Sequence, residues 1–133
     1  MLHLTKILNG RIGVPEPERI TLDANVTVSY GTPVILKDGA LETMSASSTS
    51  LPTHLILKDS TGKEILAGRI TPDMVFEVPA ASAPTSMKVG GEYLLGTGAT
   101  LSTTLASSGK RGAYLLDKAG AKAAGDRMLV CFR

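Results

Sequence analysis

The sequence is divided throughout into short apolar runs separated by glycine, proline, serine and threonine, and this spacing limits the folds open to the chain. Several runs alternate between apolar and polar residues and are rich in β-branched side chains, as in residues 20–30. No window with helical apolar spacing rivals them. Many short strands bounded by turn residues are typical of all-β domains. The pattern therefore predicts an all-β fold, a small compact barrel or sandwich with long loops and an N-terminal arm.

The strand pattern recurs along most of the chain. The expected strands cover residues 20–30, 33–37, 40–44, 53–58, 63–70, 74–78, 93–95, 100–105, 113–117 and 128–132. Asp38 and Gly39 form a tight-turn signal, and residues 59–62 are expected to turn a second hairpin. No internal repeat is evident in the sequence. We expect a single all-β domain over 20–133, preceded by an N-terminal arm or edge segment over 1–19.

Residues 128–132 are five consecutive apolar residues that follow a Gly-Asp turn at Gly125 and Asp126. A continuous apolar run is typical of a strand that is covered on both faces. Five exposed apolar residues in a row would instead be a liability. We therefore expect this strand to be an integral part of the fold.

The N-terminal segment is apolar but irregular. It carries Leu2, Leu4, Ile7 and Leu8. Two prolines follow in residues 13–19, where they disfavour both helix and strand. Two interpretations stay open: an adhesive arm that binds a partner, or an edge strand of the same domain.

Composition argues against several classes of function. The formal net charge is +2, from 14 basic and 12 acidic residues, which is too balanced to indicate binding to nucleic acid or a membrane surface. Aromatic residues make up only 4% of the chain, so stacking platforms are scarce. The single cysteine, Cys131, excludes an internal disulfide and suits a reducing compartment. With no convincing signal peptide, we expect synthesis in the cytoplasm of the host cell.

The sequence offers no clear catalytic or metal-binding set. His3 and His54 are the only histidines, and neither they nor Cys131 have the spacing of zinc ligands. A Ser-His-Asp arrangement of a serine with His54 and Asp59 is conceivable, but no nucleophile-elbow motif supports it. We interpret His54 as a partly exposed strand histidine and Cys131 as a small core residue. We expect no enzyme activity, no cofactor and no metal.

The basic pair Lys110 and Arg111 stands in a loop flanked by glycines. A solvated loop is the simpler interpretation. Contact with an acidic partner surface is the alternative, and it makes this pair a candidate for partner binding together with the four apolar residues of the arm.

The last third of the chain resembles the capsid decoration (cement) proteins of tailed bacteriophages and prophages. The resemblance lies in 89-VGGEYLLGTGATLSTT-104 and 112-GAYLLDKAGAKAAGDRMLVCF-132, and 31-GTPVILKDGAL-41 also fits. These segments follow the family's order of a valine-glycine start, a glycine turn, a threonine-rich strand and a terminal apolar strand after a Gly-Asp turn. Residues 53–78 and the N-terminal arm depart from that pattern.

The resemblance implies a structural virion protein that binds the outer surface of an assembled capsid and stabilises the shell. The implied partners are the major capsid protein and further copies of the chain on the shell, with a trimer as one form of self-association. The alternatives are another phage head or tail component, or a small ligand-binding β-barrel. A decoration protein is expected on the capsid surface of the virion after synthesis in the bacterial cytoplasm.

Overall fold

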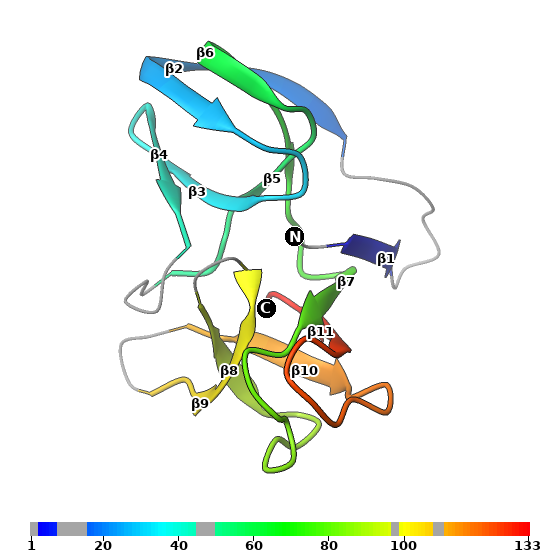
Figure 1. The fold of residues 1–133 in the computed structure, drawn as a ribbon. Coiled ribbons are helices and arrows are strands. Elements are labelled where there is room, and N and C mark those ends of the chain that lie inside the picture. Colours follow the sequence, from blue (N-terminus) through cyan, green and yellow to red (C-terminus); the bar gives the residue numbers. More distant parts are fainter. Residues whose placement is uncertain (1–2, 8–15, 45–49, 97–98, 108–110) are drawn as a thin grey trace.

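The computed structural model describes residues 3–7, 16–44, 50–96, 99–107 and 111–133, and these residues form an all-β structure (Figure 1). The strands are β1 (His3–Ile7), β2 (Pro17–Val28), β3 (Pro33–Lys37), β4 (Ala40–Thr43), β5 (His54–Ile56), β6 (Ser60–Arg69), β7 (Met74–Pro79), β8 (Glu92–Leu95), β9 (Leu101–Leu105), β10 (Ala113–Asp117) and β11 (Arg127–Cys131). The predicted fold class is confirmed. Within the described residues, no helix is long and apolar enough to cross a membrane.

The strands form two antiparallel sheets that lie one above the other in Figure 1. The first sheet has the order β2-β6-β5-β3-β4, and the second has the order β1-β7-β11-β10-β8-β9. Apart from β1, the two orders correspond strand by strand: β2 to β7, β6 to β11, β5 to β10, β3 to β8 and β4 to β9. The chain therefore builds the same five-stranded topology twice, although no repeat is evident in the sequence.

Each five-stranded unit bends so that its two outer strands approach each other. In the second unit, Ala81 N donates to Leu101 O at 2.9 Å, which links the end of β7 to β9. In the first unit, Asp23 N donates to Gly39 O at 3.0 Å, which links β2 to the β3–β4 turn. Such closure leaves few free sheet edges, and free edges are the usual sites of unwanted strand pairing.

The two units have separate hydrophobic cores. The smaller core lies in the first unit and contains Leu22, Val28, Val34, Ile56, Ile65 and Ala67. The larger core fills the second unit, with Phe76, Leu101, Leu115 and Met128 fully buried. Ile35 and Leu55, from the opposite face of the first sheet, belong to the larger core. Strands β3 and β5 therefore bury both of their faces and join the two units.

Strand β11 is a central strand, as the apolar run over 128–132 predicts. It pairs with β7 on one side and with β10 on the other. Met128 and Val130 belong to the larger core, and Cys131 is also fully buried. The turn before β11 is held by Asp126, whose Oδ2 accepts from Lys122 N at 2.9 Å and Ala123 N at 3.0 Å. These bonds favour the carboxylate and lower the pKa of Asp126.

The structure corrects the expectations for the first part of the chain. Residues 1–19 are not irregular throughout, because His3–Ile7 form β1 and Pro17 opens β2. The second hairpin also turns earlier than expected, since Ser60 to Gly62 already pair with β2. Residues 45–49, between the predicted strands 40–44 and 53–58, lie outside the described residues.

Candidate functional site

The residues proposed for partner binding in the N-terminal arm fall on β1 or beyond it. Leu4 and Ile7 pair in register with Phe76 and Met74 of β7, and β1 is an edge strand of the larger sheet. Leu2 and Leu8 lie outside the described residues. Residues 3–7 thus occupy the position of an edge strand. Binding of a partner by this strand stays a prediction.

Arg111 belongs to a small basic group at the end of β11, while Lys110 lies outside the described residues. Arg111 is exposed, and its Nη2 donates to the backbone oxygen of Arg133. The guanidinium carbon of Arg133 lies 4.3 Å from the centroid of the Tyr114 ring, which is a cation–π contact. Arg111 is therefore held against the main chain of Arg133, whose side chain lies on the Tyr114 ring of β10.

A pocket of about 410 Å³ lies where the two units meet, and we call it the junction pocket. Its apolar walls are Leu36, Leu51, Pro52, Ile70, Pro72 and Phe132. Its polar lining consists of Thr53, His54 and Arg69. These residues come from β3, β5 and β6, from the segments that lead into β5 and β7, and from the residue after β11. The volume lies within the usual range for ligand sites.

His54 is the buried polar group of this pocket, with only 8% of its surface exposed. Its Nδ1 is hydrogen-bonded to Thr53 Oγ1 at 2.8 Å, and the same oxygen accepts from Leu36 N at 2.9 Å. Burial lowers the pKa of His54, the charge of Arg69 lowers it further, and Glu18 opposes the shift. His54 is therefore a neutral imidazole near pH 7, and the interpretation of a partly exposed histidine is wrong.

Arg69 is the charged group of the junction pocket. It is exposed and stands directly opposite His54 in the β5–β6 pairing, so the two side chains share one face of the sheet. Among the described residues the one ion pair is Arg19 with Glu64, at 2.9 Å on the exposed surface. Arg69 thus has no ion-pair partner within the described part of the chain.

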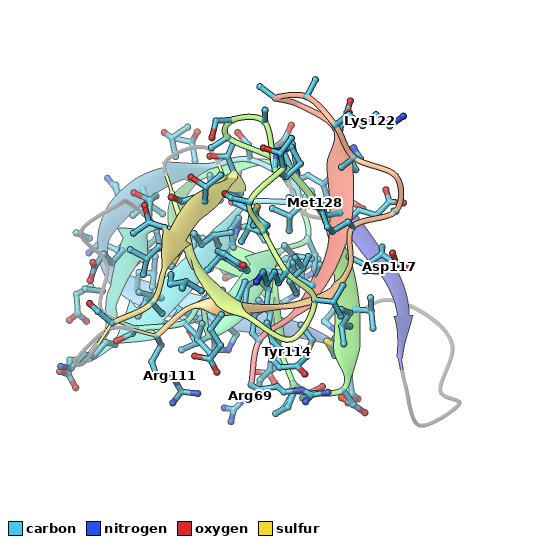
Figure 2. The ribbon with its side chains drawn as sticks, turned by 90° about the horizontal axis from the view of Figure 1, so that it is seen from below. Arg69, Arg111, Tyr114, Asp117, Lys122 and Met128 are labelled. Carbon is cyan, nitrogen blue, oxygen red and sulfur yellow. The ribbon has the colours of Figure 1, made fainter. Side chains whose placement is uncertain are left out.

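The junction pocket and the basic group are joined through the last two residues. Phe132 lines the pocket, and the adjacent Arg133 binds Arg111 and Tyr114. Figure 2 shows Arg69 and Arg111 at the same lower edge of the view, with Lys122 at the opposite edge. One side of the molecule therefore combines an apolar pocket with three arginines.

The residues considered for catalysis are not brought together. His54 Nδ1 binds Thr53, whereas Asp59 Oδ1 accepts from Tyr30 N at 2.6 Å, so these two residues do not form the conceivable Ser-His-Asp arrangement. No group of three histidine, cysteine, aspartate or glutamate side chains is placed to hold a metal within the described residues. Burial raises the pKa of the Cys131 thiol, although Arg133 opposes the shift. A buried neutral thiol is a poor nucleophile.

Comparison with known proteins shows that the fold also occurs in a solved structure. The chain is similar to the N base of the head fiber gp8.5 of bacteriophage phi29, with a TM-score of 0.51 and 17% identity. The match covers 89% of this chain and 93% of that chain. No protein-family model and no curated protein matches the sequence. The likeness shows a shared fold over nearly the whole of both chains.

Sequence reasoning missed the junction pocket because its lining comes from distant segments. Thr53, Ile70 and Phe132 meet only after both units have folded and docked. The sequence signal closest to the site is the pair His54 and Arg69, polar residues at the facing ends of two strands expected to form a hairpin.

Proposed function

We propose that the chain is a structural protein of a phage head that binds the outer surface of the assembled capsid and stabilises the shell. One observation carries the proposal: the chain shares its fold, over nearly the full length of both proteins, with the base of a phage head fiber. The sequence resemblance to capsid decoration proteins points to the same part of the virion by a separate route. Decoration and fiber attachment both require a body that adheres to the shell.

The proposed partner is the major capsid protein, with further copies of this chain beside it on the shell. A trimer is one form that this self-association takes. The architecture suits the task, because two bent β-units, joined where β3 and β5 pack into the larger core, make a stiff body with few free edges. Weak contacts to several shell subunits at once add up to tight binding.

The alternative of a ligand-binding β-barrel has less support. Such barrels hold their ligand in the interior, but the interior of the larger unit is filled by fully buried side chains such as Phe76, Leu101 and Met128. The junction pocket lies instead where the two units meet, outside the interior of the larger unit.

The proposal is tested by sedimentation with capsid shells of the phage that encodes the chain. The purified protein is mixed with expanded shells that lack it, and with isolated capsid subunits as the control. We expect saturable binding to shells and weaker binding to isolated subunits, because only the assembled lattice presents several subunits together. Absence of saturable binding to shells would contradict the proposal.

A further inference from the structure

The junction pocket and the arginines beside it have a composition that selects one kind of ligand. Arg69 is a cation whose groups all donate hydrogen bonds. Arg111 lies at the same edge as Arg69 in Figure 2, and its Nη2 binds the backbone oxygen of Arg133, which brings a third positive charge. No side-chain carboxylate of the described residues forms an ion pair with any of the three. An anionic group is therefore the complement of this surface.

His54 adds a second polar contact inside the pocket. Its Nδ1 is occupied by Thr53, so Nε2 is the ring nitrogen without a hydrogen-bond partner among the described residues. The Thr53 hydroxyl donates its one hydrogen to Val34 O at 3.4 Å, so it accepts from Nδ1, and the hydrogen of the neutral imidazole lies there. Nε2 therefore carries a lone pair and accepts a hydrogen bond from a donor of the ligand, beside the group that approaches Arg69.

The walls of the pocket exclude a purely ionic ligand. Leu51, Ile70 and Phe132 present apolar surface next to Arg69, and Leu36 continues it toward the smaller core. A ligand that fills the pocket must bring an apolar group as well as an acceptor. A nucleic acid backbone does not offer this combination, and the net charge of +2 is low for binding one.

We propose that the junction pocket is the site where an acidic segment of a capsid subunit docks, with an apolar side chain in the pocket, a neighbouring carboxylate on Arg69 and a backbone N–H on His54 Nε2. This rests on the function proposed above and adds to it the contact surface and the chemistry of the partner. Its occupant is a segment in which a glutamate or aspartate stands beside a large apolar residue.

Charge reversal tests the ionic part of the contact. Arg69 is exposed, so Arg69→Glu is expected to leave the fold intact, which circular dichroism and thermal melting check. In sedimentation with shells, we expect R69E to weaken binding by at least about tenfold. Arg69→Lys is expected to weaken binding by less, because lysine keeps the charge but loses the bidentate geometry. The matched control is Lys122→Glu, the same change of charge at the opposite edge in Figure 2, which is expected to bind like the wild type.

A probe at the rim tests whether the partner covers the pocket. Pro72 is exposed and lines the pocket, and Cys131 is the only cysteine. In the double variant Pro72→Cys with Cys131→Ala, an environment-sensitive maleimide dye labels the rim alone. We expect its emission to shift to the blue when shells are added, and the same dye at Lys122→Cys to stay unchanged.

The outcomes separate this inference from the proposed function. If the wild type does not bind shells, the proposed function fails and the inference fails with it. If the wild type binds and R69E binds equally well, or the rim dye is unaffected, the function stands and the docking site is wrong. If R69E instead changes only the self-association of the free protein, the occupant is a second copy of the chain and the inference is overturned.

Discussion

His54 on β5 and Arg69 on β6 are directly paired residues of neighbouring antiparallel strands, and both line the pocket at the junction of the two units. A buried imidazole is thus held next to a permanent positive charge. Protonation of His54 places two like charges side by side, which disfavours the folded first unit. Because both residues also line the pocket, the same pair links the stability of this unit to the proposed binding site.

The stability of the protein is expected to fall on acidification because of His54. Its pKa in the folded state is lowered below the ordinary 6.5, so the unfolded chain takes up this proton at higher pH. Well above pH 6.5 His54 is neutral in both states, so its titration does not change the free energy of unfolding. As the pH falls below 6.5, protonation of His54 in the unfolded chain lowers the free energy of unfolding. Glu18 reduces the effect without reversing it.

The variant His54→Gln isolates this effect, since every other titrating group is common to both proteins. Urea unfolding across this pH range should show a steeper loss of stability on acidification in the wild type than in H54Q. Equal slopes in the two proteins would show that His54 titrates alike in the folded and unfolded chains.

Gly112 is expected to tolerate no side chain. A Cβ at this position would lie 2.7 Å from the backbone oxygen of Tyr93 and 2.9 Å from its carbonyl carbon and nitrogen, so β8 and β10 would have to separate. Gly112→Ala should cost about 1–3 kcal/mol or more in the free energy of unfolding. The control is Gly96→Ala, where the nearest atom lies at an ordinary 3.6 Å. Similar melting of the two variants would contradict the close packing of β8 on β10.

Two neighbouring residues of β11 should differ in their importance for stability. Met128 is fully buried in the larger core, so Met128→Ala should lower the free energy of unfolding by about 2–5 kcal/mol. Leu129 is only half-buried, and Leu129→Ala should cost less. Deletion of residues 126–133 removes the strand between β7 and β10 and should give insoluble or molten protein. A soluble deletion variant that melts like the wild type would contradict the central position of β11.

The buried thiol of Cys131 should resist modification in the folded protein. Burial removes access and raises the pKa, so little thiolate is present near pH 7. A maleimide or disulfide reagent should react slowly with native protein and rapidly in urea. Cys131→Ala should remain folded, at a cost of about 1 kcal/mol. Rapid labelling without denaturant would show that the outer face of β11 is open to solvent.

Deletion of Met1–Asn9 tests the N-terminal segment as a binding element. The rest of the second unit keeps its barrel closure through β9, which does not involve β1. We therefore expect the deletion variant to stay folded by circular dichroism and to bind shells more weakly. Unfolding would assign the segment to the core, and unchanged binding would remove it from the contact surface.

The local pattern of the sequence was sufficient to predict most of the strands. Residues 33–37 and 113–117 have the predicted bounds, since strong apolar runs lie between turn residues there. For residues 1–19 the sequence left an edge strand as one of two interpretations, because a short edge strand depends on its partner β7 and has little pattern of its own. The repeated topology was missed because strand order depends on long-range pairing, which a single sequence does not display.

The candidate site was less predictable than the fold. Arg111 was singled out from sequence, but its contact with Arg133 depends on the pairing of β10 with β11. The burial of His54 follows from the docking of the two units and not from the residues beside it in the chain. Surfaces built at such a junction are visible only in three dimensions.

Electron cryo-microscopy of shells incubated with the purified chain tests the central claim most directly. The account predicts ordered density for the two β-units on the outer surface of the shell, with the junction pocket turned toward a capsid subunit. Density only inside the shell or on the tail, or shells that remain bare at saturating protein, would contradict it.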